Sequence, residues 1–272
     1  MCKRFTPLSH NEAQDILDAF TEGKPIRLPD KDINDAKHDV FPGKTSPVFL
    51  SDSKGGLVLV EATWGFPAAD GKKLIFNTRL DTALRHLVSG EGMWSKAIEQ
   101  GRCLVPTRAF YENRKADKRY SERSDKERSD KRQMDKPQQA GKLNKQQSGK
   151  LIKQQYRVSL NGTKAFFMAG VFQDGRFSIV TTTPNNTMAL IHDRMPLVLG
   201  PGETSIWLGP NFAMLADRSN LRLLAKPESD SDLAKKSRTN RWLFTGQTFY
   251  ETSFSQGQVD RSTPQLYALC SL

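Results

Sequence analysis

The sequence lacks the features that mark membrane-spanning, exported and disulfide-stabilised proteins. No apolar run approaches the ~18 residues of a membrane-spanning helix, and no apolar stretch follows Met1 as in a secretory signal peptide. Only three of the 272 residues are cysteines, and they lie far apart at Cys2, Cys103 and Cys270. An odd and scattered set excludes a disulfide framework and indicates a reducing compartment. We therefore expect a cytoplasmic protein.

Signatures of metal and nucleotide chemistry are missing as well. The chain has no Cys-x-x-Cys pair and no His-Glu-x-x-His motif, so nothing predicts a zinc site. Gly43-Lys44-Thr45 resembles the end of a phosphate-binding loop, but His38 occupies the position of the required upstream glycine. Ser205 lacks the flanking glycines of a nucleophile elbow. We expect neither a metal nor a cofactor.

Acidic residues are too few to balance the basic ones, and one segment accounts for most of the excess. The net charge is +11, and residues 114–155 carry 14 Lys or Arg against six Asp or Glu. This segment is repetitive and poor in apolar residues, which predicts a disordered insertion. It is either a basic arm that adds affinity for nucleic acid or a tolerated solvated loop.

The residues on either side of the insertion have the patterning of a folded domain. Ser9 and Glu12 have the spacing of a capping box, which predicts the start of a helix. Further helices are expected from Thr78, and from Thr183-Pro184 to about Ile191. Short apolar runs predict strands at 47–50, 57–62 and 74–76.

A three-stranded meander is predicted after the insertion. Strands at 156–160, 163–172 and 176–182 are separated by the turn pairs Asn161-Gly162 and Asp174-Gly175. Antiparallel hairpins together with isolated helices indicate an α+β fold and not a doubly wound sheet. The insertion then lies within one domain, which we expect to span residues 2–272.

Cys2 follows the initiator Met1, and this position has a specific chemical consequence. If Met1 is removed, residue 2 carries an α-amine and a thiol on adjacent carbons. The amine can condense with an aldehyde to an imine, and the thiol can then close a five-membered thiazolidine ring. A cysteine at position 2 has no such role in most proteins, so further motifs must decide.

Four further stretches complete a recognisable set with Met1-Cys2. They are Trp64-Gly65-Phe66-Pro67, Phe76-Asn77-Thr78-Arg79, the run from Gly101 to Glu112, and the run from Ile191 to Leu199 with the sequence IHDRMPLVL. In this order they resemble the SRAP (SOS response-associated peptidase) family. The resemblance implies a single α+β domain with an antiparallel, barrel-like sheet core and flanking helices.

The resemblance also implies an activity and four catalytic residues. Members of the family bind single-stranded DNA and crosslink covalently to abasic sites, whose ring-opened sugar is an aldehyde. Cys2 matches the crosslinking residue, exposed when the protein removes its own Met1. Asn77 matches the active-site Asn that holds the amine or sugar oxygens, and Glu112 matches the carboxylate that protonates the sugar oxygen. His192 matches the catalytic His for ring opening and reversal. β-Elimination at the imine stage would give a lyase side activity.

Five further residues are implied to contact DNA. Arg4 and Arg79 match basic positions that hold phosphates. Trp64 and Phe66 match a wedge that stacks on bases, and Pro42 is a looser match on the same surface. The implied partner is single-stranded DNA with abasic sites, bound by a monomer that is nucleoid-associated when on DNA, with no membrane or metal partner.

Each residue has a plainer interpretation, and two positions depart from the family pattern. Asn77 alone is an ordinary turn or cap residue, Glu112 a surface carboxylate and His192 a core histidine. Lys3 replaces the family's usual Gly after the catalytic Cys, and Asn113 replaces a Trp after the Tyr-Glu pair.

Two other functions remain open on the sequence. An N-terminal-nucleophile amidohydrolase or peptidase would use Cys2 to attack an acyl carbon, with its own amine as base. A non-catalytic single-strand-binding protein would depend on residues 114–155 and would not need Cys2.

Overall fold

The computed structural model describes residues 2–24, 27–28, 39–52, 54–114 and 154–228. The insertion predicted at 114–155 lies outside these ranges except for its ends. The helices are α1 (His10–Thr21), α2 (Leu80–Ser89), α3 (Ser95–Gln100), α5 (Asn186–Ala189), α6 (Glu203–Leu208) and the 3-10 helix η2 (Phe212–Ala216). The strands are β1 (Phe5–Pro7), β2 (Thr45–Ser51), β3 (Leu57–Trp64), β4 (Phe66–Pro67), β5 (Leu74–Ile75), β6 (Asn77–Arg79), β7 (Arg102–Asn113), β8 (Gln155–Leu160), β9 (Phe166–Gln173), β10 (Arg176–Thr182), β11 (Met195–Pro196), β12 (Val198–Leu199) and β13 (Leu223–Pro227).

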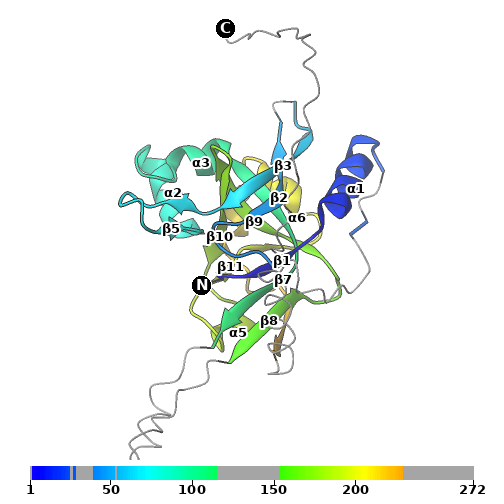
Figure 1. The fold of residues 1–272 in the computed structure, drawn as a ribbon, viewed down its shortest axis with the longest axis vertical. Coiled ribbons are helices and arrows are strands. Elements are labelled where there is room, and N and C mark those ends of the chain that lie inside the picture. The colour runs from blue at the N-terminus through cyan, green and yellow to red at the C-terminus, as the bar shows by residue number, and fades with distance from the viewer. Residues whose placement is uncertain (1, 25–26, 29–38, 53, 115–153, 229–272) are drawn as a thin grey trace, which may run out of the picture.

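Five of these strands close into a barrel (Figure 1). Their hydrogen-bonded order is β9–β10–β3–β2–β7, and β7 pairs again with β9, which closes the ring. All neighbours are antiparallel except β10 and β3. Closure leaves these strands without a free edge. The expected α+β fold with a barrel-like core is confirmed.

The long strand β7 extends beyond the barrel and carries a second small sheet. Its C-terminal part pairs with β1 on one side and with β8 on the other, and β13 adds to β8. Glu112 pairs with Tyr156, and Tyr111 pairs with Arg157. Because neighbouring residues in a strand point to opposite faces, these two pairs lie on opposite faces of the extension. We call the face of Glu112 the inner face and the face of Tyr111 the outer face.

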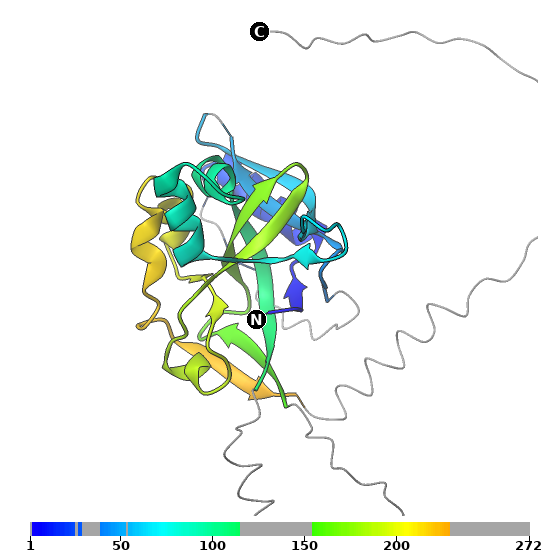
Figure 2. The same ribbon diagram turned by 90° about the vertical axis from the view of Figure 1, so that its left-hand side faces the viewer.

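Two apolar clusters hold the fold together. One fills the barrel and includes Trp64, Cys103, Phe177 and Cys2. The other lies between the barrel and its helices, and includes Ala83 of α2 and Ile98 of α3. Figure 2 shows α2, α3 and α6 along one side of the barrel. None of the helices in the described part of the chain is long and apolar enough to cross a membrane.

Local signals predicted two elements correctly. Helix α1 begins with the expected capping box, in which the Ser9 side chain and Glu12 satisfy each other's backbone amides. The β9–β10 hairpin turns at Asp174 and Gly175, both with positive φ (51° and 72°), as a tight hairpin turn requires.

Three predictions of secondary structure were wrong. β8 does not form a hairpin with β9: it pairs with β7 and β13, while β9 returns to the barrel. Thr78 belongs to β6, and α2 begins at Leu80. The helix expected from Thr183 is the short α5, capped by the Asn185 side chain. In each case tertiary pairing or a nearer cap overrides the local pattern.

Candidate active site

The backbone of Cys2 is held in place just before β1, where the chain enters the apolar cluster that fills the barrel. Cys2 is fully buried, and its thiol donates a hydrogen bond to the Arg4 carbonyl at 3.3 Å. The Asn77 side-chain amide donates to the Cys2 carbonyl at 2.8 Å. The Tyr111 amide donates to the Arg4 carbonyl at 3.0 Å, which ties this segment to β7. Residue 2 is therefore held by both β6 and β7.

Asn77 reaches this position because β6 pairs in parallel with β10, with Asn77 opposite Ile179. The side chain is buried, and its amide nitrogen is committed to Cys2. Its Oδ1 is also buried, and no described residue donates a hydrogen bond to it. A buried amide oxygen without a donor is costly, so this atom is suited to accept a hydrogen bond from a substrate or from an amine.

Glu112 and His192 come together from distant elements. Glu112 lies near the end of β7, and His192 follows α5, where its amide donates to the Met188 carbonyl. The His192 Nε2 atom is 3.9 Å from Glu112 Oε1, and both side chains are largely buried.

The other ring nitrogen, Nδ1, lies between two neighbours. It is 2.7 Å from Asp193 Oδ1 and 3.1 Å from the Arg194 amide nitrogen. The Asp193 contact needs a proton on Nδ1, whereas the Arg194 contact needs a lone pair there. The two contacts therefore cannot both form through the same nitrogen, and the tautomer of the ring decides which one forms.

The pKa of the Cys2 thiol is raised from 9.0 to about 12. The main cause is desolvation by burial, and the negative charge of Glu112 is the second. Backbone hydrogen bonds at Arg4 and Tyr111 oppose the shift only in part. Cys2 is therefore a neutral thiol in the resting protein, and the charge of Glu112 is near enough to raise its pKa.

A cationic pair lies beside this group. Arg79 Nη2 is 2.8 Å from Asp81 Oδ2, and Arg194 Nη2 is 3.1 Å from Asp81 Oδ1. Arg194 also donates to the Thr181 carbonyl. The Arg79 side chain is about half exposed, with a relative exposure of 55%, so it can meet a ligand from solvent.

The chain matches the family model for SOS response associated peptidase (SRAP) over residues 1–133 and 143–256. The chain belongs to the SRAP family.

Named relatives and solved structures agree with this membership. The chain is 24% identical over 247 residues to the abasic site processing protein YoqW of Bacillus subtilis, covering 86% of this chain and 90% of the relative. It is 23% identical to the abasic site processing protein YobE of the same organism, covering 86% and 92%. A crystal structure of a Bacteroides thetaiotaomicron protein has the same fold, with 18% identity, a TM-score of 0.54, and coverage of 86% and 94%.

The structure gives Arg4 of this SRAP chain a role different from phosphate binding. Its guanidinium lies on the outer face, where it contacts Asp39 at 2.6 Å, Glu228 at 3.1 Å and Gln155 at 2.7 Å. It also stacks over the Tyr111 ring at 3.7 Å. Only 7% of Arg4 is exposed. The prediction that Arg4 holds a phosphate is wrong, because buried carboxylates already occupy it; Arg4 anchors the segment that carries Cys2.

The predicted aromatic wedge is also wrong at Trp64 and Phe66. Trp64 is completely buried in the barrel, stacks on Phe177, and donates its ring N–H to the Phe76 carbonyl. Phe66 is 9% exposed and packs edge-on against Trp94. Neither ring can stack on a base without unfolding part of the core.

Pro42 stays a prediction, and the structure adds its neighbour. Pro42 is partly exposed, and Phe41 beside it is 48% exposed. Gly43 in the same turn donates its amide to the Trp64 carbonyl. The Phe41-Pro42 turn therefore presents an aromatic ring on the surface next to β3.

Sequence reasoning missed Arg194, although it stands in the quoted stretch two residues after His192. Its side chain is only 13% exposed and lies over the same carboxylate as Arg79. A basic residue inside a family motif was a sufficient signal. The two departures from the family pattern are both exposed: Lys3 follows the buried Cys2, and Asn113 accepts a long contact from Gln155 at 3.4 Å. Among the described residues no cluster of His, Cys, Asp and Glu is arranged to hold a metal.

Proposed function

We propose that this SRAP chain processes abasic sites in single-stranded DNA by linking them covalently to Cys2. One observation carries the proposal: Asn77, Glu112 and His192 come together around Cys2, just before β1. Asn77 contacts Cys2 directly, Glu112 acts on its pKa, and His192 lies 3.9 Å from Glu112. The names of the relatives point to the same substrate.

The first step exposes the reactive amine. Water adds across the Met1–Cys2 peptide bond, Met1 leaves as the free amino acid, and Cys2 retains a primary amine. The buried Oδ1 of Asn77 is suited to accept a hydrogen bond from this amine, because Asn77 already holds the Cys2 carbonyl. Such a bond would direct the nitrogen lone pair toward an incoming aldehyde.

The second step forms the link. A proton from the Glu112–His192 pair goes to the ring oxygen of the sugar, the bond between C1 and the ring oxygen breaks, and the C1 hydroxyl returns its proton to the pair, which leaves the open aldehyde. The Cys2 amine attacks the aldehyde carbon, and loss of one water gives an imine. The Cys2 thiol then adds to the imine carbon: a carbon–sulfur bond forms, and the thiol proton passes by way of Glu112 to the nitrogen. The product is a thiazolidine, and no oxidant or metal is needed.

The surrounding residues supply the DNA contacts in this proposal. Arg79 and Arg194 share Asp81, and a phosphate can replace this carboxylate on both guanidinium groups. The exposed Phe41 beside Pro42 takes the stacking role that Trp64 cannot fill. A β-elimination from the imine, which breaks the bond to the 3′ phosphate, is the lyase branch of the same chemistry.

The test is adduct formation on a single-stranded oligonucleotide with one abasic site. Untagged protein should give an adduct that survives heating in denaturant. Cys2→Ala keeps the amine, so it should give only an imine that needs borohydride to survive, whereas Cys103→Ala should behave as wild type because that thiol is buried in the barrel. A wild-type protein that forms no adduct would refute the proposal. Adduct formation by Cys2→Ala without borohydride would refute the thiazolidine.

The two alternatives give different results in the same assay. An N-terminal-nucleophile hydrolase would form no DNA adduct and would depend on Cys2 for amide cleavage. A binding module without catalysis would bind the oligonucleotide equally well with Cys2→Ala. The arrangement of Glu112 and His192 against a buried Cys2 favours the crosslinking function over both.

A further inference from the structure

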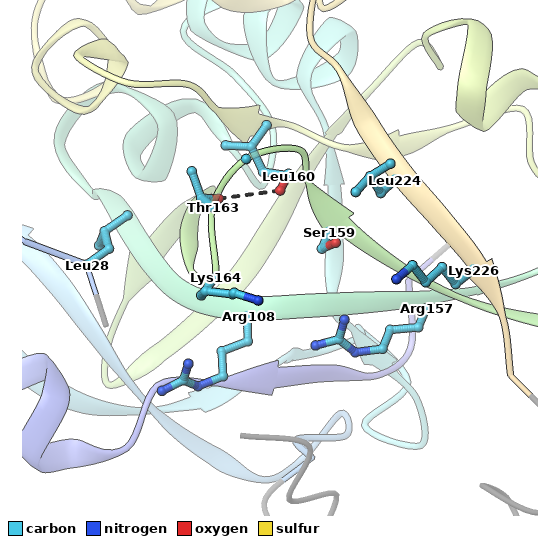
Figure 3. Close-up of a pocket in the computed structure, with 10 residues that line it drawn as sticks. Leu28, Arg108, Arg157, Ser159, Leu160, Thr163, Lys164, Leu224 and Lys226 are labelled. Atoms are coloured by element: carbon cyan, nitrogen blue, oxygen red, sulfur yellow. Dashed lines mark hydrogen bonds between the residues drawn. The ribbon is translucent and has the colours of Figure 1, made fainter. Parts of the chain in front are cut away.

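A basic pocket lies on the outer face of the β7–β8–β13 extension, the face opposite Glu112 (Figure 3). It has a volume of about 490 Å³, within the range of small-ligand sites. Four cationic side chains from separate elements line it, and the described lining residues include no acidic one, although Glu12 contacts Arg108 from α1. These cations are Arg108, Arg157, Lys164 and Lys226.

Two of these cations are placed in an unfavourable way for the protein alone. Arg157 of β8 and Lys226 of β13 are directly opposite each other in the register. Like charges in this arrangement repel across the sheet. Within the described ranges, neither side chain makes an ion pair or a hydrogen bond. Arg108, in contrast, is ion-paired with Glu12 of α1.

The rest of the pocket supplies hydrogen-bond donors beside the charges. Ser159 lies two residues from Arg157, so it shares that face of β8, and Thr163 follows in the turn after β8. Figure 3 shows both residues beside the cationic side chains, with the Thr163 hydroxyl directed at the Leu160 carbonyl, to which it donates at 3.5 Å. Cationic side chains with hydroxyl groups close by are the recognition chemistry of phosphate groups.

From this juxtaposition we propose that the outer-face pocket is a second anion site, which binds phosphate groups between Arg157 and Lys226. The phosphates come from one of two sources: the backbone of the single strand held at Cys2, or a free polyphosphate such as that of a nucleotide. The first source rests on the proposed function, whereas the second does not. For the strand source, the inner and outer faces of the extension meet at the Asn113–Gln155 pair, one pair beyond Glu112.

The test is the double variant Arg157→Gln/Lys226→Gln, with Lys54→Gln/Lys96→Gln as a control of equal charge. The control residues are exposed, in the β2–β3 turn and on α3. Binding of an undamaged single-stranded oligonucleotide is measured by fluorescence anisotropy over a series of salt concentrations. If two phosphates bind here, the pocket variant should lower the slope of log K against log salt by about 1.4. The control variant should keep the pocket's contribution to this slope.

The second arm uses inorganic tripolyphosphate, with binding measured by calorimetry. Loss of tripolyphosphate binding with an unchanged DNA slope identifies a free polyphosphate as the ligand, and a lowered DNA slope identifies the strand. If neither DNA nor tripolyphosphate distinguishes the pocket variant from the control, the site does not exist. Crosslinking to an abasic oligonucleotide is followed separately at saturating DNA, where the pocket variant should match wild type. A failure of crosslinking in wild type would thus refute the proposed function and leave the pocket result intact.

Discussion

Cys2 should be almost unreactive toward alkylating agents in the folded, DNA-free protein. Its pKa is raised from 9.0 to about 12 by burial and by Glu112, and only the thiolate is nucleophilic. At pH 8 a thiol with an ordinary pKa is roughly one-tenth ionised, and a thiol with a pKa near 12 is roughly 0.01% ionised. Folding should therefore slow alkylation of Cys2 about 1,000-fold, apart from any steric effect.

The assay is time-resolved labelling with iodoacetamide, read by mass spectrometry of the peptide that contains Cys2. The same protein in denaturant provides the unshifted reference, and the mass separates chains with and without Met1. Chains that retain Met1 should show the full protection. Without Met1, the new ammonium group lies beside the thiol and should lower its pKa and raise the labelling rate.

Glu112→Gln separates the two causes of the shift. It removes the negative charge but leaves the burial, so the Cys2 pKa should fall and labelling should rise on the order of threefold. Cys103 is the internal control, because burial alone raises its pKa. Native Cys2 that labels within tenfold of the denatured rate would refute the reasoning, and so would a Glu112→Gln effect of equal size on Cys103.

Three further variants and a deletion test the assignments of individual residues. Arg4→Gln should lower the free energy of unfolding by about 3–5 kcal/mol in chemical denaturation, because it leaves Asp39 and Glu228 buried without their cation. Trp64→Ala should lower the same quantity by about 3–5 kcal/mol, whereas Phe41→Ala should weaken DNA binding in anisotropy and leave the unfolding curve unchanged. Deletion of residues 115–153, with Arg114 joined to Gln154, should preserve crosslinking and flatten the salt dependence of DNA binding.

Sequence signals were sufficient where the chemistry is local. The capping box at Ser9 and the Asp174-Gly175 turn each specify their structure within a few residues, and both formed as predicted. Cys103, in an apolar strand, was interpreted as a small buried hydrophobe, and it is fully buried. The Asn161-Gly162 pair has equally good turn chemistry, yet β8 pairs elsewhere. A turn fixes the local bend, whereas the partner of a strand is decided by the whole barrel.

The candidate site depended on a family pattern, because no local signal brings its parts together. Asn77 and Glu112 lie on strands that pair with different partners, and His192 follows a short helix far along the chain. Spacing in the sequence does not show that these side chains meet. What the structure adds is their shared position around Cys2 and the presence of Arg194 beside Arg79.

The errors at Arg4 and Trp64 have one physical origin, and it bears on how the site works. A motif gives the residue type and not the face of the sheet toward which it points. Arg4 is two residues from Cys2, yet its guanidinium crosses to the outer face, where Asp39, Glu228 and Tyr111 hold it. This anchor explains how a residue next to a chain terminus can be buried and fixed, since termini are otherwise poorly ordered. Under the proposed function Arg4 acts through the position of Cys2, and loss of its ion pairs should affect crosslinking only as far as it frees that segment.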